Sequence, residues 1–278
     1  MNLIIQSPSS IAEEAIAHLV QLSGATSSQR VSDTVYRLPG ARNNEQAVAD
    51  YCAQARLDFG YVEAGRRLAD FGLVVMDMDS TLITIECIDE IADMLGIRTQ
   101  VAEVTAAAMR GEIEFAESLR RRVALLAGLD QSALQRVYDE RLRFSPGAET
   151  MLAALRRHNV KTLLVSGGFT FFTDRLKTRL QLDYTASNTL EIVDGKLTGK
   201  VLGKIVDAQG KADWLQRVRD ELGLRREQVI AIGDGANDLK MLAEAGTSIA
   251  YHAKPVVRAV TTYAFNYVGL DGLIGLYE

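Results

Sequence analysis

The sequence predicts an α/β protein built on a parallel sheet, and three short apolar runs support that prediction. The runs occupy residues 73–76, 162–165 and 229–232, with helical patterns between them. Wholly apolar runs of this length are typical of strands buried on both faces of a parallel sheet. Buried strands alternating with helices predict a doubly wound, Rossmann-like core, in which ligands bind at the carboxyl ends of the strands.

Residues 1–70 are predicted to form a separate small α/β domain. A strand is expected at residues 3–5, and Ser9-Ser10 could cap a helix whose apolar residues repeat at helical spacing as far as Val20. A second strand is expected at 34–38, and a second helix at about 44–55. This order is similar to that of small ligand-sensing modules, but no residue in the domain demands a particular chemistry.

Residues 71–278 are expected to form the main domain, with a helical insertion at about 84–145. The insertion shows helical patterns without a strand signal, and its first apolar stripe is Ile88, Ile91, Ala92 and Leu95. The simplest interpretation is a cap over the carboxyl edge of the sheet. Further along, alternating residues around Asp194-Gly195 predict a hairpin.

Composition excludes several classes of protein. The 278 residues include 31 basic and 36 acidic side chains, a net charge of −5, which argues against nucleic-acid binding through bulk charge. No apolar run approaches the roughly 18 residues of a membrane span. The start lacks the features of a signal peptide, and the only cysteines, Cys52 and Cys87, are too few for a disulfide framework. The expected location is therefore a reducing cytoplasm.

Acidic residues follow two of the predicted strands. Asp77 and Asp79 come directly after the first strand, and they point to the same side if the strand geometry continues. Asp234 and Asp238 follow the strand at 229–232, and neighbouring strand ends would bring Asp77, Asp79 and Asp234 together. Carboxylate oxygens without His or Cys suit a hard cation such as Mg²⁺. An acidic loop that caps a helix, or a purely structural ion site, is the alternative.

The strand at 162–165 is followed by a turn suited to a phosphate. Ser166-Gly167-Gly168 offers a hydroxyl and free backbone N–H groups at a strand-to-helix turn. Lys211 begins a helical pattern and could reach a phosphate oxygen. Taken singly, the glycines could form a plain tight turn and the lysine could be a solvated surface group.

The predicted cap carries a charge on an apolar helix face. Arg122 falls on the stripe formed by Phe115, Leu119, Val123 and Leu126, where a charge needs a partner. It could pair with Glu117, or it could bind a substrate carboxylate through its planar fork. Glu86, at the start of the first cap helix, is a candidate partner for an ammonium group. Together with a phosphate cradle, these residues suit a phosphorylated amino acid.

These motifs resemble those of the haloacid-dehalogenase-like phosphatases, over about residues 71–275. The core motifs are Asp77-Met78-Asp79-Ser80-Thr81, Ser166-Gly167-Gly168, Lys211 and Gly233-Asp234-Gly235-Ala236-Asn237-Asp238. Further strings resemble the branch of that superfamily that acts on phosphoserine. They are Ile85-Glu86-Cys87-Ile88-Asp89-Glu90-Ile91, Ala108-Met109-Arg110-Gly111 and Ala250-Tyr251-His252-Ala253-Lys254-Pro255.

The resemblance implies a role for each motif residue in hydrolysing O-phospho-L-serine, the last step of serine biosynthesis. Asp77 would be the nucleophile and would carry an aspartyl phosphate, and Asp79 would act as general acid and then as general base. Mg²⁺ would be held by Asp77, the backbone carbonyl of Asp79 and Asp234. Asp238 would orient Lys211 or the metal site from behind.

The resemblance also implies how the substrate is held. The groups that bind phosphate would be Ser166, the Gly167 amide, Lys211 and Asn237. Glu86 and Arg122 would bind the substrate's ammonium and carboxylate groups, and Met109 and Phe115 would line an apolar wall.

Two alternative functions remain open at this point. One is a phosphatase or phosphotransferase of the same superfamily that acts on another small phosphorylated metabolite. The other is a non-catalytic regulator that binds phosphate or an amino acid. No nucleic acid or membrane partner is expected, and a homodimer is compatible with the sequence.

Overall fold

The computed structural model describes residues 1–42 and 44–278, and within these residues the strands form two β-sheets. The smaller sheet is antiparallel, with the strand order β2-β3-β1-β4. Its strands are β1 (Asn2–Gln6), β2 (Gln29–Arg30), β3 (Val35–Pro39) and β4 (Asp58–Val62), and its helices are α1 (Glu13–Ser23) and α2 (Glu45–Ala55).

Two features of the N-terminal region differ from the sequence-based expectation. The N-cap of α1 is Ala12 rather than Ser9-Ser10, because the chain stays extended there and the Ile11 amide bonds the Asp33 carbonyl at 3.0 Å. Strand β4 was not predicted. Its inward positions include Asp58 and Gly60, which hide the apolar alternation that marks a strand.

The larger sheet has the strand order β11-β10-β9-β5-β6-β7-β8. The pairs from β11 to β7 are parallel, and β8 pairs antiparallel with β7. The strands are β5 (Leu73–Met76), β6 (Lys161–Phe169), β7 (Tyr184–Val193), β8 (Lys196–Leu202), β9 (Val229–Gly233), β10 (Thr247–Tyr251) and β11 (Tyr263–Phe265). Every residue of β5 and β9 is buried, as their apolar runs predicted.

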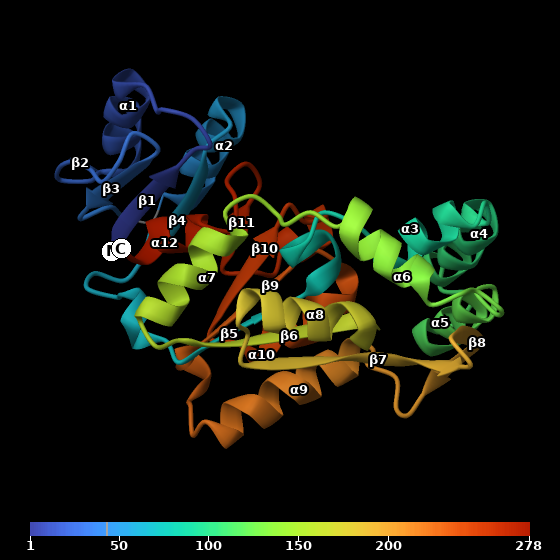
Figure 1. Cartoon of the computed structure of the whole chain (residues 1–278). Helices are drawn as coiled ribbons and strands as arrows, with labels where there is room; N and C mark the ends of the chain where they lie inside the picture. Colours follow the sequence, from blue (N-terminus) through green and yellow to red (C-terminus); the bar gives the residue numbers. More distant parts are fainter. Residues whose placement is uncertain (43) are drawn as a thin grey trace.

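Helices cover both faces of this sheet, which confirms the doubly wound core (Figure 1). In β5, Val74 and Met76 pack into one hydrophobic cluster, whereas Leu73 and Val75 pack into another. The first cluster includes α7 (Ala148–Arg157), α8 (Thr170–Leu180) and α12 (Gly272–Tyr277). The second includes α9 (Ala208–Glu221), α10 (Leu239–Glu244) and α11 (Pro255–Arg258).

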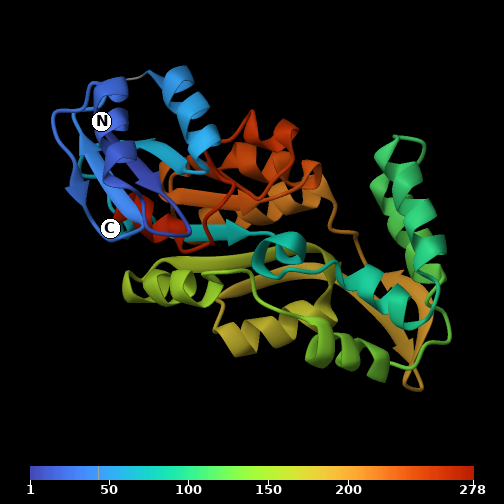
Figure 2. The same ribbon diagram turned by 90° about the horizontal axis from the view of Figure 1, so that it is seen from above.

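Between β5 and β6 the chain forms a helical cap at one end of the core. The cap helices are α3 (Cys87–Met94), α4 (Arg98–Met109), α5 (Phe115–Ala124) and α6 (Ser132–Arg136). Figure 2 shows them beyond one end of the large sheet, with the N-terminal sheet at the other end. The stripe predicted for the first of them is wrong at Leu95, which is 37% exposed because α3 ends at Met94.

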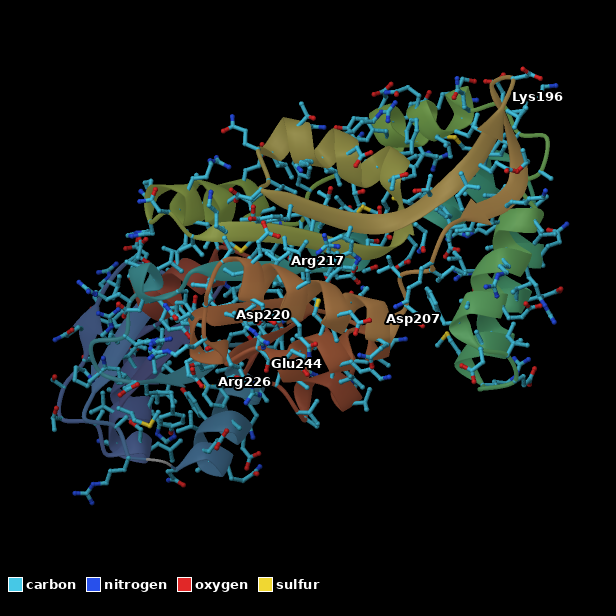
Figure 3. The ribbon with its side chains drawn as sticks, turned by 90° about the horizontal axis from the view of Figure 1, so that it is seen from below. Lys196, Asp207, Arg217, Asp220, Arg226 and Glu244 are labelled. Atoms are coloured by element: carbon cyan, nitrogen blue, oxygen red, sulfur yellow. The ribbon has the colours of Figure 1, made fainter. Side chains whose placement is uncertain are left out.

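The predicted hairpin joins core and cap. Val193 pairs with Lys196 across Asp194-Gly195, and both turn residues have the positive φ that a tight two-residue hairpin turn needs. Leu197 exchanges backbone hydrogen bonds of 2.8 Å with Gly128 and Leu129, which follow α5. Figure 3 labels Lys196 at the hairpin tip, beside the cap. The hairpin therefore links the core sheet to the cap.

The N-terminal sheet is attached to the core through β4. The buried carboxylate of Asp58 accepts backbone hydrogen bonds of 2.8–2.9 Å from Asn266, Tyr267 and Val268. The Tyr263 hydroxyl donates to the Tyr61 carbonyl at 3.1 Å. Helix α12 packs against β1 and β4. Across the described part of the chain, no helix is both long and apolar enough to cross a bilayer.

Candidate active site

Asp77 lies at the carboxyl end of β5 and is buried. One of its oxygens, Oδ1, accepts hydrogen bonds from the Met78 amide and from Lys211 Nζ, both at 2.7 Å. Burial raises the pKa of Asp77 well above its ordinary value, and the charge of Asp238 adds to this while Lys211 opposes it. A carboxylate in this position is costly unless positive charge lies nearby.

Asp79 lies beside Asp77, although not through continued strand geometry as expected. The strand ends at Met76, and the chain then folds into a short turn in which Ser80 has a φ of 56°. Asp79 Oδ1 accepts from the Cys87 amide at 3.0 Å, and Ser166 Oγ lies 3.4 Å from Oδ2. Burial raises the pKa of Asp79, and the hydrogen bonds from Cys87 oppose the rise.

A cluster of carboxylates forms where β5 and β9 lie side by side. Oxygens of Asp77, Asp234 and Asp238 lie within 4.8 Å of one another, an arrangement consistent with a metal site. Met76 pairs with Ile232, so the loops after the two strands leave the sheet together. Burial, followed by the charge of Asp238, raises the pKa of Asp234.

Lys211 provides positive charge in this cluster. It is 1% exposed, and its Nζ lies 2.7 Å from both Asp77 Oδ1 and Asp238 Oδ1. Burial alone would lower the pKa of Lys211, but the carboxylates of Asp238 and Asp77 raise it. The other oxygen of Asp238 accepts the amides of Asp234 and Gly235 at 3.1 Å. Asp238 therefore holds the lysine and the loop that carries Asp234.

Ser166-Gly167-Gly168 was predicted to form a turn after a strand at 162–165, but β6 continues to Phe169, and the three residues form an irregular stretch near its carboxyl end, beside Asp79. The name Ser166–Gly168 turn is kept for this stretch. Ser166 Oγ accepts from the Gly168 amide at 2.8 Å. A Cβ at Gly167 would lie 3.0 Å from the Phe115 ring, and one at Gly168 would lie 2.9 Å from Asp79 Oδ2. The glycines let the backbone approach both neighbours closely. Asn237 is exposed in the loop after β9.

Glu86 and Arg122 lie at the cap side of the site. Glu86 lies at the water-exposed mouth, where its Oε1 accepts from Ser80 Oγ at 2.7 Å. Partial desolvation, aided by the charge of Asp79, raises its pKa to about 7. Arg122 is half-buried, and its Nε has no hydrogen-bond partner within residues 1–42 and 44–278. Glu117 pairs with Arg121 instead, at 2.7 Å.

Desolvation lowers the pKa of Arg122, while the charges of Asp89, Glu86 and Asp79 act in the opposite direction. Arg122 is therefore near acidic groups of the site, and its buried Nε lacks a hydrogen-bond partner among the described residues.

Met109 was expected to line the site, and that expectation stays a prediction. Its side chain is 71% exposed at the end of α4. Helix α4 packs mainly on α3 and α5, with Val101 as its buried residue, so its end has no core surface to pack against.

A family model described as haloacid dehalogenase-like hydrolase matches residues 74–243, which is more than half of the chain. The chain belongs to the haloacid dehalogenase-like hydrolase family. A second model, for a domain of unknown function, matches residues 3–50.

Similar proteins of this hydrolase family include a phosphoserine phosphatase from Polaromonas sp. strain JS666. It is 53% identical over 217 residues, which cover 76% of this chain and 92% of the relative. A phosphoserine phosphatase from Vibrio cholerae is 48% identical over 218 residues, which cover 78% of this chain and 66% of the relative.

Solved structures extend the likeness to the whole chain. A haloacid dehalogenase family hydrolase from Salmonella enterica serovar Typhi has a TM-score of 0.91 at 35% identity, and covers 100% of this chain and 98% of that one. A substrate-bound phosphoserine phosphatase complex has a TM-score of 0.70 at 34% identity, and the match covers 75% of this chain and 99% of that one.

The site of this family member contains two buried side chains that sequence reasoning missed. Thr81 Oγ1 donates to Asp234 Oδ1 at 2.9 Å. Asn188, in β7, donates from Nδ2 to the Gly167 carbonyl at 2.8 Å. Asn188 could have been noticed because it shares the inward face of its strand with Ala186 and Leu190, where a polar side chain needs a partner.

Proposed function

We propose that this chain hydrolyses O-phospho-L-serine to L-serine and inorganic phosphate through an aspartyl phosphate on Asp77. The observation that carries the proposal is the unpartnered Nε of Arg122 on the cap side of a buried Asp77–Lys211 pair. Such a site offers a cation to a substrate carboxylate close to a nucleophile and a phosphate-binding turn. The names of the similar proteins support the same substrate.

The proposed reaction has two displacements at phosphorus. In the first, a carboxylate oxygen of Asp77 forms a bond to phosphorus while the serine oxygen leaves and takes a proton from Asp79. In the second, Asp79 accepts a proton from water as the water attacks phosphorus and releases Asp77. The raised pKa of Asp79 favours the protonated carboxyl that the first step needs.

Phosphoryl oxygens would be held by Ser166, the Gly167 amide, Lys211 and Asn237. Lys211 is fixed by Asp238, so its charge is already in place before substrate binds. Asn237 is exposed in the short helical turn Ala236–Asp238 after β9, where its amide would donate to the phosphate.

The residues present fit Mg²⁺. The carboxylates of Asp77, Asp234 and Asp238 gather oxygens and no His or Cys, which is the donor set of a hard cation. Asp77, Asp234 and the backbone carbonyl of Asp79 would hold the ion, while Asp238 remains bound to Lys211. When bound, Mg²⁺ supplies positive charge that offsets the charge of the phosphate and the carboxylates.

The cap would select the amino acid. Arg122 would bind the substrate carboxylate, Glu86 its ammonium group, and Phe115 would form the apolar wall. Closure of the cap would exclude water during the first displacement. Met109, which is exposed in this structure, would join Phe115 on that wall.

The test is phosphate release from O-phosphoserine, a sugar phosphate and an aryl phosphate, with Mg²⁺ and with a chelator. We expect rapid Mg²⁺-dependent release from O-phosphoserine, and none from an Asp77→Asn variant that folds normally. Equal rates on all esters would favour a phosphatase or phosphotransferase for another metabolite. No release at any Mg²⁺ concentration would favour a binding regulator.

The proposal includes the organisation of the chain and its place in the cell. Residues 1–70 would form one domain and residues 71–278 the catalytic domain, with the cap at about 84–145. The reaction would be the last step of serine biosynthesis in the cytoplasm. A homodimer stays a prediction from the sequence.

A further inference from the structure

The ladder between β6 and β7 is interrupted at the Ser166–Gly168 turn. Val165 pairs with Ala186, and the next pair is Phe169 with Asn188. Residues 166–168 of β6 therefore lie opposite the single residue Ser187. Their backbone groups leave the regular ladder, so the partly buried carbonyl of Gly167 needs another partner.

The Asn188 side chain supplies that partner. It is 1% exposed, and its Nδ2 donates to the Gly167 carbonyl at 2.8 Å. Its Oδ1 accepts from the Val206 amide, also at 2.8 Å. Val206 directly precedes Asp207, the N-cap of α9, whose carbonyl accepts the Lys211 amide at 2.9 Å. The side-chain amide of Asn188 thus joins the Ser166–Gly168 turn to the start of α9, the helix that carries Lys211.

These bonds fix the orientation of a peptide plane at the site. The Gly167 carbonyl and the Gly168 N–H belong to the same planar peptide. Asn188 holds its oxygen, and Ser166 Oγ accepts its N–H at 2.8 Å. Two adjacent glycines would otherwise allow many backbone conformations. The same Ser166 hydroxyl lies 3.4 Å from Asp79 Oδ2, so the fixed plane also orients a side chain of the site.

We propose that Asn188 is a positioning residue, whose amide holds the Ser166–Gly168 turn and the start of α9 in one arrangement for binding phosphate. It acts through the Gly167 carbonyl and the Val206 amide and does not touch the substrate. This inference rests on the proposed function for its catalytic consequence. Its consequence for phosphate binding can be measured separately.

The decisive variant is Asn188→Asp, which has nearly the same shape. The new carboxylate still accepts from Val206 but presents an oxygen to the Gly167 carbonyl, which repels it. At pH 8 we expect kcat/KM to fall roughly 10- to 100-fold, the usual effect of losing a supporting hydrogen bond at a site. Inorganic phosphate, titrated by calorimetry with Mg²⁺ present, should also bind at least about tenfold more weakly.

Lowering the pH should restore phosphate affinity to the Asn188→Asp variant, which would not happen if Asn188 were merely structural. Burial raises the pKa of a carboxyl group. Once protonated, the new group can again donate to the Gly167 carbonyl, so the ratio of variant to wild-type phosphate affinity should rise between pH 8 and pH 5.5. Asp79 and Lys211 face the turn and titrate in both proteins, so this ratio isolates the new group.

Ser187→Ala is the matched control, because Ser187 precedes Asn188 and bonds Thr173 Oγ1 at 2.7 Å. It should leave kcat/KM and phosphate affinity within about twofold of wild type. If Asn188→Asp does not fold, Asn188→Ser serves instead, since its short hydroxyl cannot span both partners. Unchanged phosphate affinity in a folded Asn188 variant would overturn the inference.

The two proposals fail in different ways. A wild-type chain that binds phosphate but does not hydrolyse O-phosphoserine would overturn the proposed function, and the comparison of phosphate affinities would still decide the role of Asn188. A wild-type chain that neither hydrolyses the ester nor binds phosphate would overturn both.

Discussion

Lys211 shares a buried space with more negative than positive charge. Its Nζ touches Asp77 and Asp238, and Asp234 lies within the same cluster of oxygens. Burial, and after it the charge of Asp238, raises the pKa values of Asp77 and Asp234 in the folded chain, and one lysine does not neutralise the three carboxylates. This excess of negative charge is consistent with a site for a further cation.

The pH dependence of unfolding tests this charge imbalance. Asp77, Asp79 and Asp234 have raised pKa values, and that of Glu86 is about 7. An acid with a raised pKa binds its proton more tightly when folded, so its contribution to stability is present at low pH and is lost as the pH rises through the folded pKa. When a chelator keeps the site free of metal, we expect the contribution of these acids to the unfolding free energy to fall as the pH rises from about 4.5 to 7.

Urea denaturation at pH 5 and pH 7, with chelator and with Mg²⁺, measures the effect. Mg²⁺ should stabilise the chain more at pH 7 than at pH 5, because protons compete for the same oxygens. Glu86→Gln removes the carboxyl group whose pKa is about 7, so the unfolding free energy of this variant should depend less on pH between pH 6 and pH 8. An equal Mg²⁺ effect at both pH values would contradict the assignment of the cluster.

Arg122 gives a second prediction at the scale of a residue. Arg122→Ala should raise KM for O-phosphoserine about ten- to hundredfold, which corresponds to the roughly 1.5–3 kcal/mol of a charged hydrogen bond. Phosphoethanolamine lacks the carboxylate, so its KM should change little. Arg121→Ala is the control, because Arg121 is exposed and paired with Glu117. Similar KM increases for both substrates would make Arg122 a structural residue.

The positions of the core residues could be predicted because each directly follows a buried strand or opens a helix. Asp77 and Asp234 directly follow β5 and β9, and Ser166 lies near the carboxyl end of β6, at the edge where parallel strands bring ligand groups together. Asn188 and Met109 could not be placed in this way. The role of Asn188 depends on a ladder interruption that no local pattern records, and the exposure of Met109 depends on how the cap helices pack.

Among the elements, helix α9 carries Lys211 in its first turn, so the stability of its N-terminus affects the site. Its N-cap Asp207 accepts the Gly210 amide at 2.8 Å, one residue before Lys211. Figure 3 labels Asp207 at the start of this helix. Loss of a capping carboxylate exposes unsatisfied N–H groups and removes a favourable charge at the positive end of the helix.

Asp207→Ala should lower the unfolding free energy by about 0.5–2 kcal/mol, as loss of an N-cap usually does. Asp207→Asn keeps an acceptor oxygen and should remain close to wild type. Chemical denaturation of the three proteins measures the difference. Equal losses in both variants would mean that the charge, rather than the hydrogen bond, stabilises the start of α9.

Elements whose apolar residues follow a regular strand or turn pattern were predicted from the sequence. Strand β4, in which polar or small residues occupy inward positions, was not. Strands β5 and β9 are uniformly apolar, and the β7–β8 turn carries Asp194-Gly195. Strand β4 places Asp58 and Gly60 at inward positions because they meet partners from the core, Asn266 and Tyr263. A tertiary contact of that kind overrides the pattern from which strands are recognised.

At the scale of the whole molecule, Asp58 joins the N-terminal sheet to the core. Asp58→Ala leaves the partly buried Tyr267 amide and the buried Val268 amide without their partner, and should lower the unfolding free energy by about 3 kcal/mol. Asp50→Ala is the control, because Asp50 is exposed on α2 and, among the described residues, accepts a side-chain hydrogen bond from Gln46 alone. It should change the unfolding free energy by less than about 0.5 kcal/mol. Equal effects would contradict the role of Asp58 as the attachment.

Removal of the N-terminal sheet should weaken the core. Ile4 and Val62 belong to the same hydrophobic cluster as Leu276 of α12. A chain that starts at residue 63 would expose that apolar surface to water, so we expect a lower denaturation midpoint than for the full chain. An unchanged midpoint would mean that the two sheets are thermodynamically independent.

The contact between β4 and β11 also protects the chain from aggregation. Each is the last strand of its own sheet, and an open sheet edge is a template for pairing with another molecule. Here the Tyr263 hydroxyl bonds the Tyr61 carbonyl, and Asp58 binds the backbone just after β11. Each edge covers the other. The chain that starts at residue 63 lacks β4 and leaves the edge of β11 uncovered, so light scattering should detect aggregates of this shortened chain at concentrations where the full chain stays dispersed.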